Sequence, residues 1–165
     1  LDAVTIMQEK HTLEGLSVAI CGDVAHSRVA NSNAKLLTKM GAQVRFVAPA
    51  FMMPEKLPAP GVLCFDTMEE GISGADVVMM LRVQKERMER SAIPDDSTYF
   101  RDYGLTVERL GLAHKDALVM HPGPMNRGVE IADEVADDPH RSLMTRQVAN
   151  GVPTRMAVLD LVMGG

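Results

Sequence analysis

A cluster of prolines and glycines interrupts this chain where its pattern otherwise predicts a buried strand. The apolar residues 117–120 (ALVM) are followed directly by the sequence HPGPMNRG at residues 121–128. Proline removes a backbone donor and fixes φ, whereas glycine adopts conformations that other residues avoid. Neither strand nor helix can continue, so the chain must form a rigid turn with free backbone carbonyls and amides at the carboxyl end of a strand. In open α/β sheets, small molecules bind at that edge.

The fold class follows from short apolar runs that alternate with helical patterns. The run LSVAICG at residues 16–22 is nearly continuous, as in a parallel strand buried on both faces. Alternation of this kind predicts a single-domain α/β fold: a doubly wound, five-stranded parallel sheet, Rossmann-like, with helices on both faces. The predicted strands are Leu16–Gly22, Gln43–Ala48, Val62–Phe65, Ala75–Val83 and Ala117–His121.

Two helices are expected between the first four of these strands. One spans Arg28–Met40, with Ser27 as its N-cap and Gly41 ending it, and the other spans Thr67–Ile72 with Thr67 as its cap. The Pro-rich segment 51–60 is expected to be a loop that contains one helical turn. The buried face of the first helix is predicted to consist of Ala30, Ala34, Leu37 and Met40.

Helical patterns also occupy both ends of the chain, over Leu1–Glu9 and Val152–Met163. The second segment is apolar nearly all round, so as a helix it needs cover on more than one side, which one sheet cannot supply. We therefore expect these two helices to lie side by side with uncovered apolar faces, and the chain to self-associate through them.

Composition excludes several classes of function. Hydrophobic residues make up 46% of the 165 residues and charged residues 24%, as in ordinary globular domains, and the net charge of −5 argues against a nucleic-acid partner. No apolar run approaches the length of a membrane span. Cys21 and Cys64 lie in apolar runs and are predicted to be buried free thiols of a cytoplasmic protein. The first residue is Leu and there is no signal peptide, so a fragment or processed product is expected.

An arginine is expected at the first turn of the helix that follows the first strand. The connecting sequence GDVAHSRVANSN contains a lone glycine, Gly22, and not the G-x-G-x-x-G pattern of dinucleotide-binding proteins. Arg28 instead follows the N-cap, where backbone amides and the helix dipole already favour an anion. The alternative for Arg28 is a solvated side chain or an ion pair with Asp23.

A second arginine ends the fourth predicted strand. Arg82 follows an apolar strand, so we expect it at the mouth of a pocket, where its planar guanidinium can bind a carboxylate or phosphate through two parallel hydrogen bonds. Gln84 can both donate and accept there. Lys85 and Arg87 are interpreted as part of a solvated helix start.

Together these strand ends predict a pocket for a dianion, most simply a dicarboxylate. Arg28, Arg82 and Gln84 would face the turn at Pro122 and Gly123. The sequence shows no Ser-His-Asp set, no cysteine nucleophile and no metal-ligand spacing, so no cofactor or metal is expected. The histidines are scattered; His121 has the strongest claim to a role, because it opens the Pro-Gly-Pro turn.

Four segments carry a family resemblance: GDVAHSRVANSN, LRVQKER, HPGPMNRGVEI and QVANGVPTRMAVL. In this order and spacing they resemble the aspartate carbamoyltransferase family, specifically the C-terminal, aspartate-binding half of the bacterial catalytic chain. In the related ornithine enzymes the last turn is similar to His-Cys-Leu-Pro, and the amino-acid loop has a Ser-Met-Gly motif. This chain has neither, which favours aspartate.

The resemblance implies a role for each pocket residue. Arg28 and Arg82 would bind the two carboxylates of L-aspartate, and Gln84 would support its orientation. The backbone carbonyls of Pro122 and Gly123 would bind the amino group of carbamoyl phosphate. The aspartate amine would attack the carbamoyl carbon through a tetrahedral intermediate, with positioning and oxyanion stabilisation supplying the rate.

The resemblance also implies that half of the enzyme is missing. The family's Ser-Thr-Arg-Thr and His-Pro-Thr-Gln motifs, which bind carbamoyl phosphate, and the loop donated by a neighbouring subunit belong to an N-terminal half, against which the apolar C-terminal helix would pack. A full-length enzyme of this family would be a homotrimer, with a dihydroorotase or a regulatory subunit as candidate partners.

Two other functions remain alternatives on sequence alone. One is a non-catalytic, carbamoyltransferase-like scaffold or binding module; two pocket arginines disfavour it. The other is an ordinary Rossmann nucleotide binder, which the missing glycine pattern disfavours.

Overall fold

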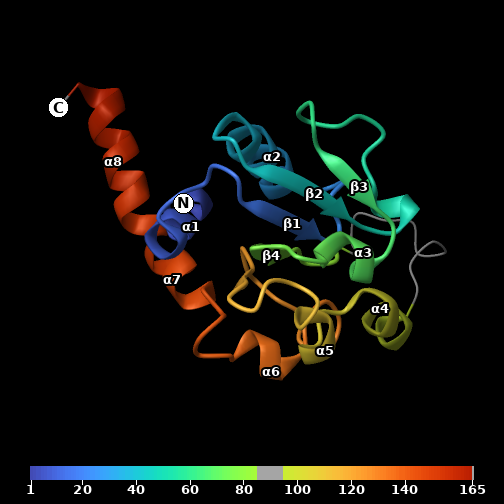
Figure 1. Ribbon diagram of the computed structural model, residues 1–165. Coiled ribbons are helices and arrows are strands. Elements are labelled where there is room, and N and C mark those ends of the chain that lie inside the picture. Colours follow the sequence, from blue (N-terminus) through green and yellow to red (C-terminus); the bar gives the residue numbers. More distant parts are fainter. Residues whose placement is uncertain (85–94, 165) are drawn as a thin grey trace.

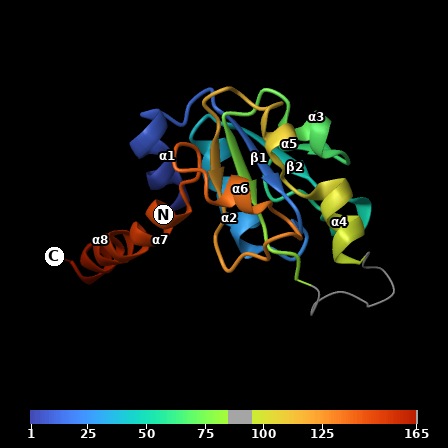
Figure 2. The same cartoon turned by 90° about the horizontal axis from the view of Figure 1, so that it is seen from below.

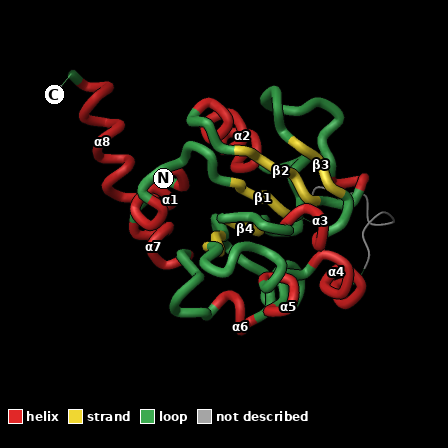
Figure 3. Tube along the Cα trace, in the orientation of Figure 1, coloured by secondary structure: helices red, strands yellow, loops and turns green. Residues whose placement is uncertain are grey.

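The predicted parallel sheet is present in the computed structural model, which describes residues 1–84 and 95–164. Its five strands are all parallel, in the order β3-β2-β1-β4-β5 (Figures 1 and 3). The chain builds outward from β1 in one direction and then returns to build in the other, so the connections reverse between β1 and β4. In doubly wound sheets a ligand binds at this reversal, beyond the carboxyl ends of the strands. The strands are β1 Ser17–Cys21, β2 Gln43–Val47, β3 Leu63–Phe65, β4 Val77–Met80 and β5 Leu118–Met120.

Helices cover both faces of the sheet, because side chains alternate along each strand. In β1, Val18 and Ile20 face α1 (Asp2–Lys10) and α2 (Arg28–Lys39), whereas Ala19 and Cys21 face the opposite cluster. In Figure 1, α2 lies above the sheet and α3, α5 and α6 lie below it; Figure 2 shows the second layer from below. The helices below the sheet and at its ends are α3 Met68–Ile72, α4 Asp96–Tyr103, α5 Val107–Leu110, α6 Asp133–Ala136, α7 Met144–Ala149 and α8 Gly151–Met163.

The predicted helix starts are confirmed by their caps. The hydroxyl of Ser27 accepts a hydrogen bond from the amide of Ala30 at 3.1 Å, and Thr67 caps α3 in the same way. The single helical turn expected in the Pro-rich segment is the 3-10 helix Ala50–Met52. Met40 is exposed although it was predicted on the buried face of α2, because the helix ends one residue earlier and Met40 is already its C-cap.

The fourth strand is shorter than its apolar run. The amide of Leu81 still donates to the carbonyl of Cys21, but β1 then turns away at Gly22, where φ is +112°. A side chain at Gly22 would lie 2.9 Å from the carbonyl oxygen of Leu81. The two backbones thus approach closely where the ladder ends, and only glycine fits at this position.

The two cysteines have different environments. Cys21 is fully buried in β1, and burial raises the pKa of its thiol well above its ordinary value. Cys64 is exposed, so the prediction that it is buried was wrong. It lies in β3, an edge strand of the sheet, and an apolar run in the sequence does not reveal whether its strand is central or at the edge. Both thiols are free.

Glycine at position 71 permits close packing of α3 on β2. A Cβ atom there would lie 2.3 and 2.7 Å from the two Cγ atoms of Val47. Overpacking costs about 1–3 kcal/mol, and the preference of a helix for alanine over glycine offsets ~1 kcal/mol of this. We therefore expect Gly71→Ala to lower the free energy of unfolding by up to about 2 kcal/mol. Urea denaturation measures this, with the exposed neighbour Glu70→Ala as control; a Gly71→Ala chain that is as stable as the control would contradict it.

Helix α8 extends away from the rest of the molecule, beyond α1 and α7 (Figures 1 and 2). At its base, the side-chain amide of Asn150 donates to Thr5 and Gln8 of α1 at 2.9 and 2.8 Å. None of the helices in the described ranges has the length and apolar character that a membrane crossing needs. Large apolar side chains are exposed on α1, on its N-cap residue and on α8: Leu1, Val4, Met7, Val152, Met156, Val158, Leu159, Leu161, Val162 and Met163.

We expect this apolar surface to make the chain associate with itself in a concentration-dependent manner, because uncovered patches of this kind are unusual on monomers. Sedimentation velocity over a range of concentrations measures the effect. The double variant Leu159→Gln, Val162→Gln should shift the chain toward monomer. Leu36→Gln, at an exposed position on α2, should leave the association unchanged. A wild-type chain that stays monomeric at high concentration would count against the prediction.

Candidate functional site

A cavity of about 330 Å³ opens at the reversal point of the sheet. Its walls come from the carboxyl ends of β1, β4 and β5, as the topology requires. The five residues predicted to form the pocket all line this cavity: Arg28, Arg82, Gln84, Pro122 and Gly123. The lining residues are His26, Ser27, Arg28, Val29, Leu81, Arg82, Gln84, Pro122, Gly123 and Pro124.

Arg28 lies on the first turn of α2, directly after the capping residue Ser27, and is exposed toward the cavity. The alternative pairing with Asp23 is not what the described residues show. Asp23 is fully buried and its Oδ1 lies 2.7 Å from Nδ1 of His26, while also accepting from the His26 amide at 3.3 Å. The helix start therefore presents Arg28 to the cavity without that competing carboxylate.

Sequence reasoning missed His26 as a wall of this cavity. Its imidazole is held by the buried Asp23 carboxylate, three residues earlier in the same turn. The spacing Asp-x-x-His within a turn was the available signal, but a histidine in a polar loop gives no indication of which neighbour it contacts.

Arg82 and Gln84 lie just beyond β4 and are half-buried. The Gln84 amide donates to the carbonyl of His26 at 3.4 Å, which links the two strand ends on either side of the reversal. Lys85 and Arg87, interpreted as a solvated helix start, lie outside the described residues.

The turn after β5 closes the third side of the cavity. Pro122 is half-buried, Gly123 is exposed with φ +65°, and the Gly123–Pro124 peptide is cis. His121 is 1% exposed and does not line the cavity; it lies beneath the turn, where its Nδ1 accepts a hydrogen bond from the amide of Gly123 at 2.9 Å. The sequence singled out His121 without specifying a role, and the structure places it beneath the turn and not in the cavity wall.

The electrostatics of the lining favour an anion. It contains two guanidinium groups and an imidazole, and none of its described residues is acidic, although the whole chain has a net charge of −5. Two guanidiniums on adjacent strand ends suit a ligand with two carboxylates better than one with a single negative charge. In the described ranges, His, Cys, Asp and Glu side chains form no group of three that could hold a metal ion.

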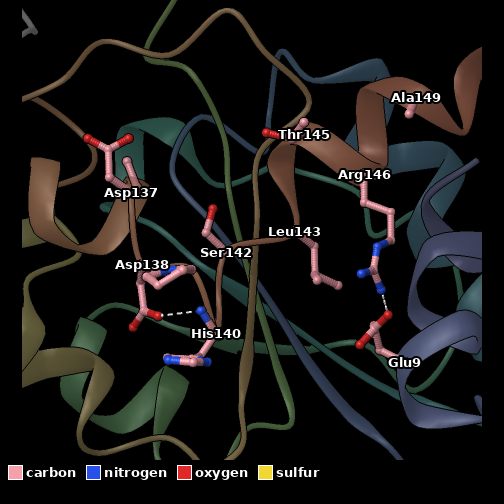
Figure 4. Close-up of a pocket in the computed structure, with 11 residues that line it drawn as sticks. Glu9, Asp137, Asp138, His140, Ser142, Leu143, Thr145, Arg146 and Ala149 are labelled. Atoms are coloured by element: carbon pink, nitrogen blue, oxygen red, sulfur yellow. Dashed lines mark hydrogen bonds and ion pairs between the residues drawn. The ribbon is translucent and has the colours of Figure 1, made fainter.

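A larger hollow of about 740 Å³ lies elsewhere, between α1 and the segment from α6 to α7 (Figure 4). Several of its charged side chains are already engaged within the protein: Arg146 pairs with Glu9, and the Asp138 carboxylate accepts a hydrogen bond from the backbone amide of His140 at 2.8 Å. Asp137 is bound by Arg127 at 2.7 Å. Internal pairing of this kind leaves little charge for a ligand, so the smaller cavity at the strand ends is the better candidate.

Comparison with known proteins identifies the family of the chain. Residues 14–162 match the family described as aspartate/ornithine carbamoyltransferase, Asp/Orn binding domain. The aspartate carbamoyltransferase catalytic subunits of Granulibacter bethesdensis and Rhodospirillum rubrum are 56% and 57% identical to the chain, over 97% and 99% of it. The match covers 51% of each of them, so the chain spans about half the length of these curated relatives.

Solved structures with a similar fold are also carbamoyltransferases. The ornithine carbamoyltransferase from Pyrococcus furiosus superposes with a TM-score of 0.87 at 28% identity, covering 99% of this chain and 55% of that one. The aspartate transcarbamoylase from Trypanosoma cruzi, in complex with N-(phosphonacetyl)-L-aspartic acid, superposes with a TM-score of 0.79 at 28% identity, covering 96% of this chain and 52% of that one.

Proposed function

The chain belongs to the aspartate/ornithine carbamoyltransferase family, and we propose that it is the aspartate-binding half of an aspartate carbamoyltransferase. The observation that supports this most directly is the placement of Arg28 and Arg82 at two adjacent strand ends around one cavity. The aspartate enzymes among the relatives, at 56–57% identity, point to the same substrate.

In this proposal each of the two guanidinium groups binds a different end of the substrate. Arg28 and Arg82 each bind one carboxylate of L-aspartate, and Gln84 orients the molecule from its position between the strand ends. The amine of aspartate then faces the turn at Pro122 and Gly123. Since ornithine has a cationic side chain, a cavity with two arginines and no described acidic lining residue disfavours it.

The turn after β5 would bind the other reactant. The carbonyls of Pro122 and Gly123 accept hydrogen bonds from the amino group of carbamoyl phosphate. The aspartate nitrogen attacks the carbamoyl carbon, and the resulting tetrahedral intermediate expels phosphate as its carbon–oxygen bond breaks. The amine loses one proton and N-carbamoyl-L-aspartate is formed. No covalent enzyme intermediate is needed, and positioning supplies much of the rate.

The remaining parts of the reaction fall to a second half of the protein, of the kind that the relatives contain. That half would bind the phosphate group and pack against α8. Three copies of the full-length chain would then form a homotrimer. A dihydroorotase or a regulatory subunit is a further candidate partner in the cytoplasm. The scaffold alternative gains nothing from the structure, since a scaffold has no need of two arginines in one cavity.

Titration of the labelled chain with succinate, followed by NMR, tests the proposal. Succinate has the two carboxylates of aspartate without its amine, and we expect shifts in the amides of Ser27–Val29 and Gly123, at weak, roughly millimolar affinity. Lactate is the control with one carboxylate and should bind more weakly. Shifts around the larger hollow of Figure 4, or none at all, would contradict the assignment of this cavity to aspartate.

A further inference from the structure

The turn after β5 rests on a buried histidine–glutamate pair. His121 is 1% exposed and Glu130 is fully buried. Nε2 of His121 lies 3.2 Å from Oε1 of Glu130, and the same oxygen accepts a hydrogen bond from the amide of Asn126 at 2.5 Å. One carboxylate therefore holds both the histidine at the start of the turn and the backbone near its end.

The hydrogen bonds determine which nitrogen of His121 carries the proton. The amide of Gly123 can only donate, so Nδ1, which receives this bond at 2.9 Å, must present its lone pair. Nε2 must then carry the hydrogen that bonds to Glu130. Glu130 thereby selects the tautomer that makes His121 an acceptor toward the turn.

The direction of the Gly123 amide sets the direction of the Pro122 carbonyl. The two groups belong to the same peptide unit, and the Pro122–Gly123 peptide is trans, so its N–H and C=O point in opposite directions. With the N–H directed inward to His121, the carbonyl oxygen of Pro122 points away from His121. Pro122 lines the cavity and His121 lies beneath the turn, which is the arrangement expected if that carbonyl faces the cavity.

We propose that His121 is a positioning residue that aims the Pro122 carbonyl into the cavity, and that Glu130 maintains the tautomer this requires. The proposal rests on the proposed function, in which that carbonyl accepts a hydrogen bond from the amino group of carbamoyl phosphate. A carbonyl already aligned before the reactant arrives needs no reorganisation when it binds.

The pair is itself anchored to three helices. The amide of His121 donates to the side chain of Gln147 in α7 at 3.0 Å, and Gln147 donates to Asp2 of α1 at 2.9 Å. The other oxygen of Asp2 accepts from Asn33 of α2 at 2.6 Å. These buried and half-buried contacts hold the backbone of His121, while Glu130 and the amide of Gly123 bind the two nitrogens of its ring.

The first test measures the unmodified chain by NMR. We expect the ring nitrogens of His121 to report the neutral tautomer with the proton on Nε2, and the amide of Gly123 to be protected from hydrogen exchange although the residue is exposed. A proton on Nδ1, or an unprotected Gly123 amide, would overturn the proposal. Neither readout depends on catalysis.

The second test compares two variants of similar polarity. In His121→Asn the side-chain oxygen can still accept from the amide two residues on, as asparagine does in turns. His121→Gln reaches toward Glu130 but places no acceptor at the position of Nδ1. We expect protection of Gly123 to survive in the asparagine variant and to be lost in the glutamine variant; equal behaviour of the two would count against the proposal.

Kinetics show whether the alignment serves the reaction. We would join the chain to the N-terminal half of the Rhodospirillum rubrum catalytic subunit and measure both substrates. His121→Gln should raise the KM for carbamoyl phosphate ~10-fold relative to His121→Asn, with the KM for aspartate little changed. A change confined to aspartate, or none, overturns the proposal. A fused wild type that makes no carbamoyl aspartate counts against the proposed function, and the NMR results still decide the alignment of the turn.

Discussion

Replacement of Arg82 by alanine should reduce the affinity of the chain for succinate by roughly 10- to 150-fold. Hydrogen bonds to a charged group contribute about 1.5–3 kcal/mol each, and every 1.4 kcal/mol corresponds to about tenfold in affinity. Arg28→Ala should have an effect of the same size, because the two arginines lie on different strand ends and each binds one carboxylate. NMR or calorimetric titration measures these losses.

The chemistry of the guanidinium can be separated from its charge. Arg82→Lys retains the charge but cannot form two parallel hydrogen bonds to one carboxylate, so it should also impair binding. Arg155→Ala is the matched control, since it removes the same charge from an exposed position on α8 that does not line the cavity. If succinate and lactate bind equally, or if neither alanine variant weakens succinate binding, the arginines do not act as a dicarboxylate clamp.

The position of the candidate site could be predicted from the sequence because a parallel sheet is a strong constraint. Once β1, β4 and β5 were recognised as strands, the residues that follow them had to meet at one edge. Arg28, Arg82 and the Pro122–Gly123 turn were therefore brought together by topology alone, without any knowledge of side-chain contacts.

The support beneath the site could not be predicted in this way. Glu130 is fully buried and lies nine residues after His121, between Val129 and Ile131, and this local sequence does not indicate that a carboxylate there contacts the histidine. Its position depends on the path of an irregular loop. The error at Cys64 has a related cause, since the order of strands in a sheet is a property of the whole chain and a local apolar run does not reveal an edge strand.

The purified 165-residue chain should form no measurable carbamoyl aspartate from carbamoyl phosphate and aspartate. Its sequence contains neither the Ser-Thr-Arg-Thr nor the His-Pro-Thr-Gln motif that the family uses to bind phosphate and stabilise the oxyanion. Removing even one such donor typically costs ~10²–10³ in rate, and here the set is missing. Aspartate bound in the cavity would then have no bound carbamoyl phosphate to attack.

Fusion to the N-terminal half of a relative gives this prediction its positive control. The fused protein should form carbamoyl aspartate, and Arg82→Ala within it should reduce the activity strongly. Lys39→Ala, at an exposed position at the end of α2 that does not line the cavity, also removes one positive charge and reports the effect of charge alone. The same Arg82→Ala change in the isolated chain separates activity of the chain from that of a contaminating host enzyme, which the substitution would not touch. Sustained product formation by the isolated chain that disappears with Arg82→Ala would show that the aspartate half is catalytic by itself, and the division of labour between the two halves would have to be abandoned.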